Sequence, residues 1–157
     1  MGRVKKITDA QDHYEEFEYN EVGDRISARN KLGATTTYGY DRRGQLTSET
    51  LPMTSVEETG ITKAVWVVNK FEYDARGNRT KEIKAFGIQS VEQVTRYEYD
   101  PMNRLKKVIG PAFLWFTPET VYSYDARGNM TSKLAPGKRG EQLRQLKSLY
   151  PDATVVC

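Results

Sequence analysis

The sequence predicts an all-β protein, built from serial antiparallel β-hairpins that form a curved open sheet. The first observation is a motif of an aromatic residue, any residue, and Tyr followed by Asp or Asn, which occurs five times. The second is that Gly or Asn follows three positions after each Asp or Asn, between two extended runs rich in β-branched and aromatic residues. The second tyrosines are separated by 21, 33, 26 and 25 residues. Repetition on this scale indicates one supersecondary unit used in series.

Each copy has the chemistry of a short hairpin turn. In residues 71–78 (FEYDARGN), Asp74 can accept hydrogen bonds from backbone amides two residues on, and Gly77 can adopt a positive φ. This pattern predicts a type I turn followed by a left-handed residue. The fourth copy keeps the same logic, because Pro101 suits the second turn position and Asn103 tolerates a positive φ. The motif is therefore predicted to shape the backbone first.

The residues expected to carry this structural motif are the second tyrosine, the turn Asp or Asn, and the left-handed residue of every copy. They are Tyr19, Asn20 and Gly23; Tyr40, Asp41 and Gly44; Tyr73, Asp74 and Gly77; Tyr99, Asp100 and Asn103; and Tyr124, Asp125 and Gly128.

The paired aromatic residues of each motif are two positions apart, so they point to the same face of a strand. Phe71 and Tyr73 share one face, whereas Glu72 points to the other. Stacked hairpins would align such pairs in cross-strand ladders, each favourable contact contributing about 0.2–1 kcal/mol. We favour this packing role over a platform that stacks sugars or bases.

The repeat pattern predicts how the chain is organised. Residues 1–137 form the repeat region, with five turn motifs and a half-repeat at the start, where Gly2–Ile7 lines up with the segment that begins Gly44-Gln45-Leu46. The strand that would precede this half-repeat is missing. Pro52–Gly60 is predicted to be a surface loop. Residues 138–157 lack the pattern, and their spaced leucines predict either a short helix that caps the last hairpin or a frayed tail.

The composition limits the classes of function. Hydrophobic residues make up 38% and charged residues 29%, which favours a thin sheet with one wet face over a thick core. The net charge of +3 is not gathered in a basic stripe, so nucleic-acid binding is not expected. No apolar run is long enough for a membrane span, and the N-terminus has no signal peptide.

The chain offers little catalytic or metal-binding chemistry. The only histidine, His13, has no nearby nucleophile pattern and is expected on a strand surface. Cys157, the sole cysteine, is the last residue, so no internal disulfide can form. One carboxylate per turn falls well short of the six to eight oxygens that calcium prefers. We therefore expect no enzyme activity, no metal and no cofactor.

The repeated Tyr-Asp motif with its spaced glycine resembles the YD repeat, also called the RHS repeat, over roughly residues 2–137. Proteins of this family include bacterial RHS and wall-associated polymorphic toxins, toxin-complex components and teneurins. The resemblance implies a long sheet of hairpins that spirals into a β-solenoid or hollow shell, which in bacterial members encloses a toxin domain. The implied partners are the remainder of a larger RHS-type protein or its toxin cargo, and the implied location is secreted or at the cell surface.

Three hypotheses of function follow. The first is a non-catalytic shell segment that encloses or presents a toxin or other cargo, since the chain contains no recognisable toxin domain or self-cleaving aspartate region. The second is a cell-surface adhesion module that binds glycan or a partner cell through Trp66, Trp115 and Phe116. The third is a gene remnant without independent activity. We also expect open sheet edges to promote self-association.

Overall fold

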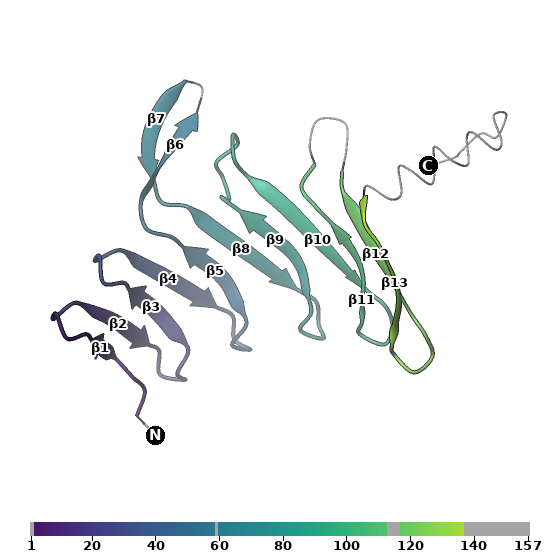
Figure 1. Cartoon of the computed structure of the whole chain (residues 1–157), viewed down its shortest axis with the longest axis horizontal. Helices are drawn as coiled ribbons and strands as arrows, with labels where there is room; N and C mark the ends of the chain where they lie inside the picture. The colour runs from purple at the N-terminus through teal and green to yellow at the C-terminus, as the bar shows by residue number, and fades with distance from the viewer. Residues whose placement is uncertain (1, 59, 113–116, 137–157) are drawn as a thin grey trace. The chain divides into compact units, whose positions relative to one another are not determined.

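The computed structural model describes residues 2–58, 60–112 and 117–136 of the 157-residue chain. The chain divides into two compact units, Met1–Val94 and Thr95–Cys157. Within the described residues the regular structure consists of antiparallel strands joined by short turns (Figure 1). This confirms the all-β class that the repeated motif predicted.

The first unit is a sheet in which neighbours along the chain are also neighbours in space. Its strand order is β1-β2-β3-β4-β5-β8-β9, and neighbouring strands are antiparallel. Short turns make this order the simplest one, because each strand can fold back directly on the strand before it. The strands are β1 (Lys6–Thr8), β2 (Tyr14–Tyr19), β3 (Arg25–Arg29), β4 (Thr35–Tyr40), β5 (Leu46–Thr50), β8 (Val68–Tyr73) and β9 (Arg79–Lys84).

A separate two-stranded sheet stands between β5 and β8. It consists of β6 (Thr54–Glu58) and β7 (Ile61–Val65), and in Figure 1 it projects from the end of the sheet opposite the tyrosine-containing turns. The prediction of a surface loop over Pro52–Gly60 was therefore wrong. Pro52 and Gly60 favoured a loop in the sequence, but the β-branched residues between and after them pair as strands.

The second unit contains the four strands β10 (Gln93–Tyr99), β11 (Leu105–Ile109), β12 (Glu119–Tyr124) and β13 (Met130–Leu134). They pair antiparallel in chain order, β10-β11-β12-β13. Within the described residues, β1 of the first unit and β13 of the second each pair on one side only, so the sheet is not closed, as predicted.

All five tyrosine-containing hairpins share one irregularity. The pairing register shifts by one residue immediately before the second tyrosine of each motif. In the hairpin β8–β9, Glu72 lies opposite Lys81 but Tyr73 lies opposite Arg79, so Thr80 is the additional residue. Such a β-bulge bends the strand and locally disrupts the ladder of backbone hydrogen bonds. The repeat therefore includes a bulge as well as a turn.

Few side chains are buried. The buried hydrophobic residues in the described part of the chain are Phe71, Ile83 and Ala85. Phe71 lies opposite Glu82, whereas Ile83 lies opposite Lys70, so Phe71 and Ile83 belong to opposite faces of the sheet. The apolar contacts are therefore spread thinly over both faces of a single layer, in keeping with the low hydrophobic content.

Candidate functional site

The turn after Tyr73 shows how the repeated motif closes a hairpin. The amide of Gly77 donates to the carbonyl of Asp74 over 3.1 Å, and the amide of Asp74 donates to the carbonyl of Asn78 over 2.9 Å. Gly77 has a φ of +93°, in the left-handed region where glycine has no Cβ penalty. The result is a type I turn closed by a left-handed residue, a common hairpin connection.

The same two backbone hydrogen bonds occur in all five motifs. In each, the left-handed residue donates to the turn Asp or Asn carbonyl, and the Asp or Asn amide donates to the carbonyl four residues on; the five first residues are Asn20, Asp41, Asp74, Asp100 and Asp125. In the fourth copy, Asn103 has a φ of +68° where the other copies have glycine. Asparagine can replace glycine here because it tolerates the left-handed region better than most residues.

The side chain of the first turn residue caps the loop. Oδ1 of Asp74 accepts hydrogen bonds from the amides of Arg76 and Asn78, each at 2.9 Å, and Oδ2 accepts one from Nδ2 of Asn78 at 2.9 Å. The hydrogen bond from the Asn78 side chain is the main cause that lowers the pKa of Asp74. The pKa of Asp125 is lowered in the same way, chiefly by Asn129.

The caps differ in charge from copy to copy. At Asp100, the hydrogen bond from the Arg104 amide is the largest cause of a lowered pKa, and the Arg104 guanidinium adds an ion pair with Nε 2.7 Å from Oδ2. Asn20 caps its turn with a neutral side chain: its Oδ1 accepts from the amides of Gly23 and Asp24 at 2.7 and 2.8 Å, and its Nδ2 donates to Oδ2 of Asp24 at 3.2 Å. The cap therefore requires an acceptor oxygen and tolerates a neutral one.

Two further turns of this kind lack the tyrosine motif and were not predicted. Asp9 accepts the amides of Gln11 and His13 through Oδ1, and Asp12 takes the left-handed position with a φ of +62°. In the sequence, Asp9 and Asp12 are turn-forming residues three positions apart, but no aromatic pair precedes them. His13 was predicted on a strand surface; it instead follows this turn, directly before β2.

The second unpredicted turn joins β3 to β4. Oδ1 of Asn30 accepts the amides of Leu32 and Ala34, each at 3.0 Å, and Gly33 has a φ of +82°. Nζ of Lys31 at its tip lies 3.0 Å from Oδ2 of Asp9 in the first of the two turns. The sequence Asn-Lys-Leu-Gly carried the same signal of Asn followed by Gly three positions later.

The second tyrosine of the motif connects a hairpin to the one before it. The hydroxyl of Tyr73 on β8 donates to the carbonyl of Leu46 at the start of β5, over 2.9 Å. The same bond joins Tyr40 to the Arg25 carbonyl at 2.9 Å. In the second unit, the hydroxyl of Tyr124 donates to the Leu105 carbonyl at 2.8 Å.

In these bonds the acceptor has the same place in the repeat. Arg25 follows Tyr19 by six positions, and Leu46 follows Tyr40 by six. At the start of the chain, Tyr19 donates to the carbonyl of Val4 at 3.0 Å. Val4 is the residue that the sequence aligned with Leu46, so the half-repeat supplies the expected acceptor.

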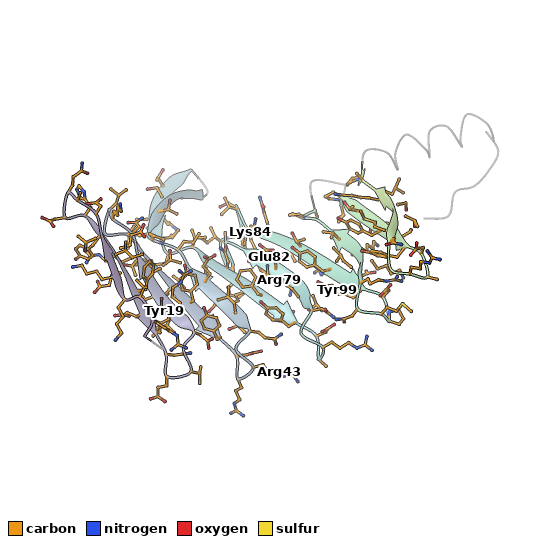
Figure 2. All side chains as sticks on the ribbon, turned by 60° about the horizontal axis from the view of Figure 1, so that its bottom comes forward. Tyr19, Arg43, Arg79, Glu82, Lys84 and Tyr99 are labelled. Carbon is orange, nitrogen blue, oxygen red and sulfur yellow. The ribbon has the colours of Figure 1, made fainter. Side chains whose placement is uncertain are left out.

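Arginine side chains add contacts between successive turns. Nη1 of Arg43 donates to the carbonyl of Ala75 in the next tyrosine-containing turn at 2.9 Å, and Arg104 likewise donates to the Asp125 carbonyl at 3.1 Å. Figure 2 shows Arg43 at the turn end of its hairpin. The guanidinium of Arg79 lies 4.5 Å from the centroid of the Phe71 ring, within the range of a cation–π contact.

A shallow depression of about 530 Å³, with both polar and apolar lining, lies between the second and third tyrosine-containing turns. Its lining includes Arg43, Gln45, Phe71, Tyr73 and Asp74. Several of these polar groups already bond to the backbone, as described above. In the part of the chain that the structure describes, no three His, Cys, Asp or Glu side chains are grouped so that they could hold a metal ion.

Among the described residues, no helix is long and apolar enough to cross a membrane. The structure does define a set of chemically matched turns, and the hydroxyls of Tyr19, Tyr40, Tyr73 and Tyr124 each link their hairpin to an earlier segment of the same unit. The turn recurs in all five motifs and the tyrosine link is seen in four of them, so the motif defines a β-hairpin repeat.

The comparisons with known proteins agree with this class. Residues 19–52, from the tyrosine of the first motif to the end of the second hairpin, match the family model described as RHS Repeat. The chain therefore carries an RHS repeat, as the Tyr-Asp motif indicated. No curated protein matches the sequence.

Solved structures share the fold. The crystal structures of TcdB2-TccC3-TEV and TcdB2-TccC3-Cdc42 each superpose with a TM-score of 0.58 at 20% sequence identity. The Tc holotoxin pore of Photorhabdus luminescens gives a TM-score of 0.58 at 19% identity. Each comparison covers 78% of this chain but 5% of the other chain, so the chain spans a small part of these much longer polypeptides.

Proposed function

We propose that this chain is a non-catalytic structural segment of an RHS-repeat shell that encloses or presents a toxin or other cargo. The observation that carries the proposal is the hydrogen bond from a motif tyrosine to the preceding hairpin, which Tyr40, Tyr73 and Tyr124 each make. A hairpin of this kind completes its neighbour, so the motif favours a sheet extended by repetition. The RHS repeat at residues 19–52 and the fold shared with Tc toxin structures support this role.

The placement of the polar groups also favours a structural role. The carboxylates and amides of the turns hold backbone amides in place, as Asp74 and Asn20 do. The buried residues are few and divided between two faces. A sheet with so little core gains stability from length and from whatever covers its faces.

The wider assignment follows from the same proposal. Residues 1–137 would be the repeat region, and the division from a tail at 138–157 stays a prediction, since that segment lies outside the described residues. The remainder of a larger RHS-type protein, or its toxin cargo, would be the partner. Its location would be secreted or at the cell surface as part of that protein. No cofactor, metal or nucleic acid enters the proposal.

The test is the size of the polypeptide that contains this segment in the cells that produce it. An antibody raised against residues 68–84 would detect the segment in cell extracts and in the culture medium. A band far above 18.0 kDa is expected. A single band at 18.0 kDa would contradict the shell proposal, and no band would favour the hypothesis of a gene remnant.

A second candidate function is a surface-binding module. Trp66 is 55% exposed at the base of the hairpin β6–β7, and Met53 beside the other strand of the same hairpin is also 55% exposed. An accessible tryptophan can stack on a sugar ring or a partner's apolar side chain. Trp115 and Phe116, the other residues of this hypothesis, lie outside the described residues. Glycan-array binding that survives Trp66→Ala would contradict a role for this site.

Self-association through open sheet edges is part of the proposal for the isolated chain. β1 and β13 each pair on one side within the described residues, and open edges invite pairing with another strand. Light scattering at high protein concentration is expected to detect oligomers. A monomer at all concentrations would contradict this expectation.

A further inference from the structure

The outer edge of β13 repeats the features with which earlier strands receive the next hairpin. β13 pairs with β12 on one side, with Val121 opposite Leu134 and Tyr122 opposite Lys133. Within the described residues no strand pairs with its other side. The equivalent sides of β5 and β11 are occupied by β8 and β12.

The first shared feature is a carbonyl acceptor. The residue six positions after a motif tyrosine accepts the hydroxyl of the next motif's tyrosine at Arg25, Leu46 and Leu105. Six positions after Tyr124 is Met130, which begins β13 and has 57% of its surface exposed. Its carbonyl thus lies where the next tyrosine would donate.

The second feature is the direction of the backbone amides. The amide of Gly110 donates to the carbonyl of Pro118, so Val108 and Thr120, two residues further along the ladder, form a hydrogen-bonded pair. Val108 therefore directs its backbone N–H and C=O toward the following strand. Lys133 follows its tyrosine by nine positions, as Val108 does, so its N–H and C=O face the open side.

The third feature is an arginine at the turn. Arg43 holds the third position of its turn and donates to the carbonyl of Ala75 in the next tyrosine-containing turn. Arg127 holds the same position of the last turn, and its side chain is exposed. An additional turn would place a carbonyl within reach of Arg127, as Ala75 is within reach of Arg43.

We infer that the β13 edge is a docking site for one further hairpin with the sequence aromatic-any residue-Tyr-Asp, which adds a strand to this sheet. This inference rests on the proposed structural role and names the partner of its last strand. The partner's tyrosine donates to the Met130 carbonyl, and its backbone pairs with Lys133. The interface has the same antiparallel strand pairing as the contacts between β11 and β12 and between β5 and β8.

The first strand of a second copy fits this edge less well. β1 has three residues, Lys6–Thr8, all exposed, and Lys5 and Lys6 place positive charge at the edge. Short strands and lysines are features that discourage edge-to-edge pairing. β1 also lacks a tyrosine that could donate to Met130.

The test is the binding of a labelled synthetic peptide to the full chain. The peptide copies residues 68–84, VNKFEYDARGNRTKEIK, which contain a complete motif and its hairpin. Fluorescence anisotropy measures binding, and hydrogen exchange of the chain shows where the peptide lies. We expect saturable binding and slower exchange at the Lys133 amide.

Two variants locate the contacts. A peptide with Tyr73→Phe is expected to bind roughly two- to tenfold more weakly, the usual worth of one hydrogen bond. Lys133→Pro in the chain removes the N–H that faces the partner and is expected to abolish binding, while Lys133→Ala, which keeps it, binds normally. Proline is tolerated on an edge strand when its missing N–H would face solvent.

The outcomes separate this inference from the shell proposal. No saturable binding, or binding unaffected by Lys133→Pro, would overturn the docking site. Equal affinity for the tyrosine and phenylalanine peptides would overturn the Met130 contact. A band far above 18.0 kDa in producing cells would still support the shell in either case.

Discussion

The hydroxyl of Tyr73 donates to the carbonyl of Leu46 over 2.9 Å and joins residues 27 positions apart. Tyr73 ends the first strand of one hairpin, and Leu46 begins the second strand of the hairpin before it. The link is therefore between repeats, whereas the turn that follows Tyr73 is within one. One motif thus forms both the turn of its own hairpin and a hydrogen bond to the hairpin before it.

Removing this hydroxyl is expected to weaken the link between hairpins. Tyr73→Phe should lower the free energy of unfolding by about 1 kcal/mol, because it deletes one hydrogen bond and keeps the ring. Urea denaturation followed by circular dichroism measures the change. Tyr38→Phe is the control, since the Tyr38 hydroxyl makes no hydrogen bond among the described residues; an equal loss in both variants would contradict a special role for Tyr73.

The left-handed position of the turn is expected to reject a side chain. Gly128→Ala should destabilise the protein by roughly 1–2 kcal/mol through backbone strain alone, since a Cβ at Gly128 would have no other atom within 4 Å. Gly77→Ala should cost at least as much, because its Cβ would also lie 3.1 Å from Nε2 of Gln45. Thermal unfolding of both variants measures the costs.

Asparagine at the same position is the matched control. Gly77→Asn should be milder than Gly77→Ala, because Asn103 already occupies the corresponding position with a φ of +68°. If the alanine and asparagine variants unfold at the same temperature, the left-handed conformation does not explain why Gly or Asn occupies this position.

The largest single loss of packing is expected at Phe71, which is 9% exposed. Phe71→Ala should lower the free energy of unfolding by about 3–5 kcal/mol, the usual cost of removing a buried phenylalanine. Phe86→Ala should cost less, because Phe86 is 43% exposed. Chemical denaturation of the two variants measures the difference, and equal losses would contradict the assignment of Phe71 to the core.

Acid is expected to loosen the aspartate-capped turns. The hydrogen bonds at Asp74 and Asp125 lower their pKa in the folded state. Their stabilising contribution is therefore present above the pKa of the unfolded chain, and it is lost as the pH falls through the lower pKa of the folded chain. The melting temperature should fall over this acidic range.

A neutral cap provides the comparison for this pH effect. The double variant Asp74→Asn, Asp125→Asn should lose less of its melting temperature between neutral and acidic pH than the unaltered protein. Asn20 shows that an asparagine can cap this turn. An unchanged pH dependence would show that other carboxylates cause the acid effect.

The sequence allowed the turns with a tyrosine to be predicted because their signal is local. Asp at the first position caps the turn with its side chain, and Gly or Asn at the fourth adopts a positive φ, so the turn depends on neighbouring residues alone. The turn at Asn30–Gly33 has the same kind of first and fourth residue, but it was not predicted because no aromatic pair precedes it. The hairpin β6–β7 was not predicted because Pro52 and Gly60, which favour loops, flank the β-branched residues of β6.

The sequence by itself determined the backbone conformation of each turn and the alternation of side chains along each strand, since both depend on residues within a few positions of one another. Only the tertiary structure decided which carbonyl each tyrosine reaches. That choice depends on how one hairpin pairs with the next and on the bulge that shifts their register. Tyr73 and Leu46 are brought together by that pairing across 27 positions, and no local pattern specifies it.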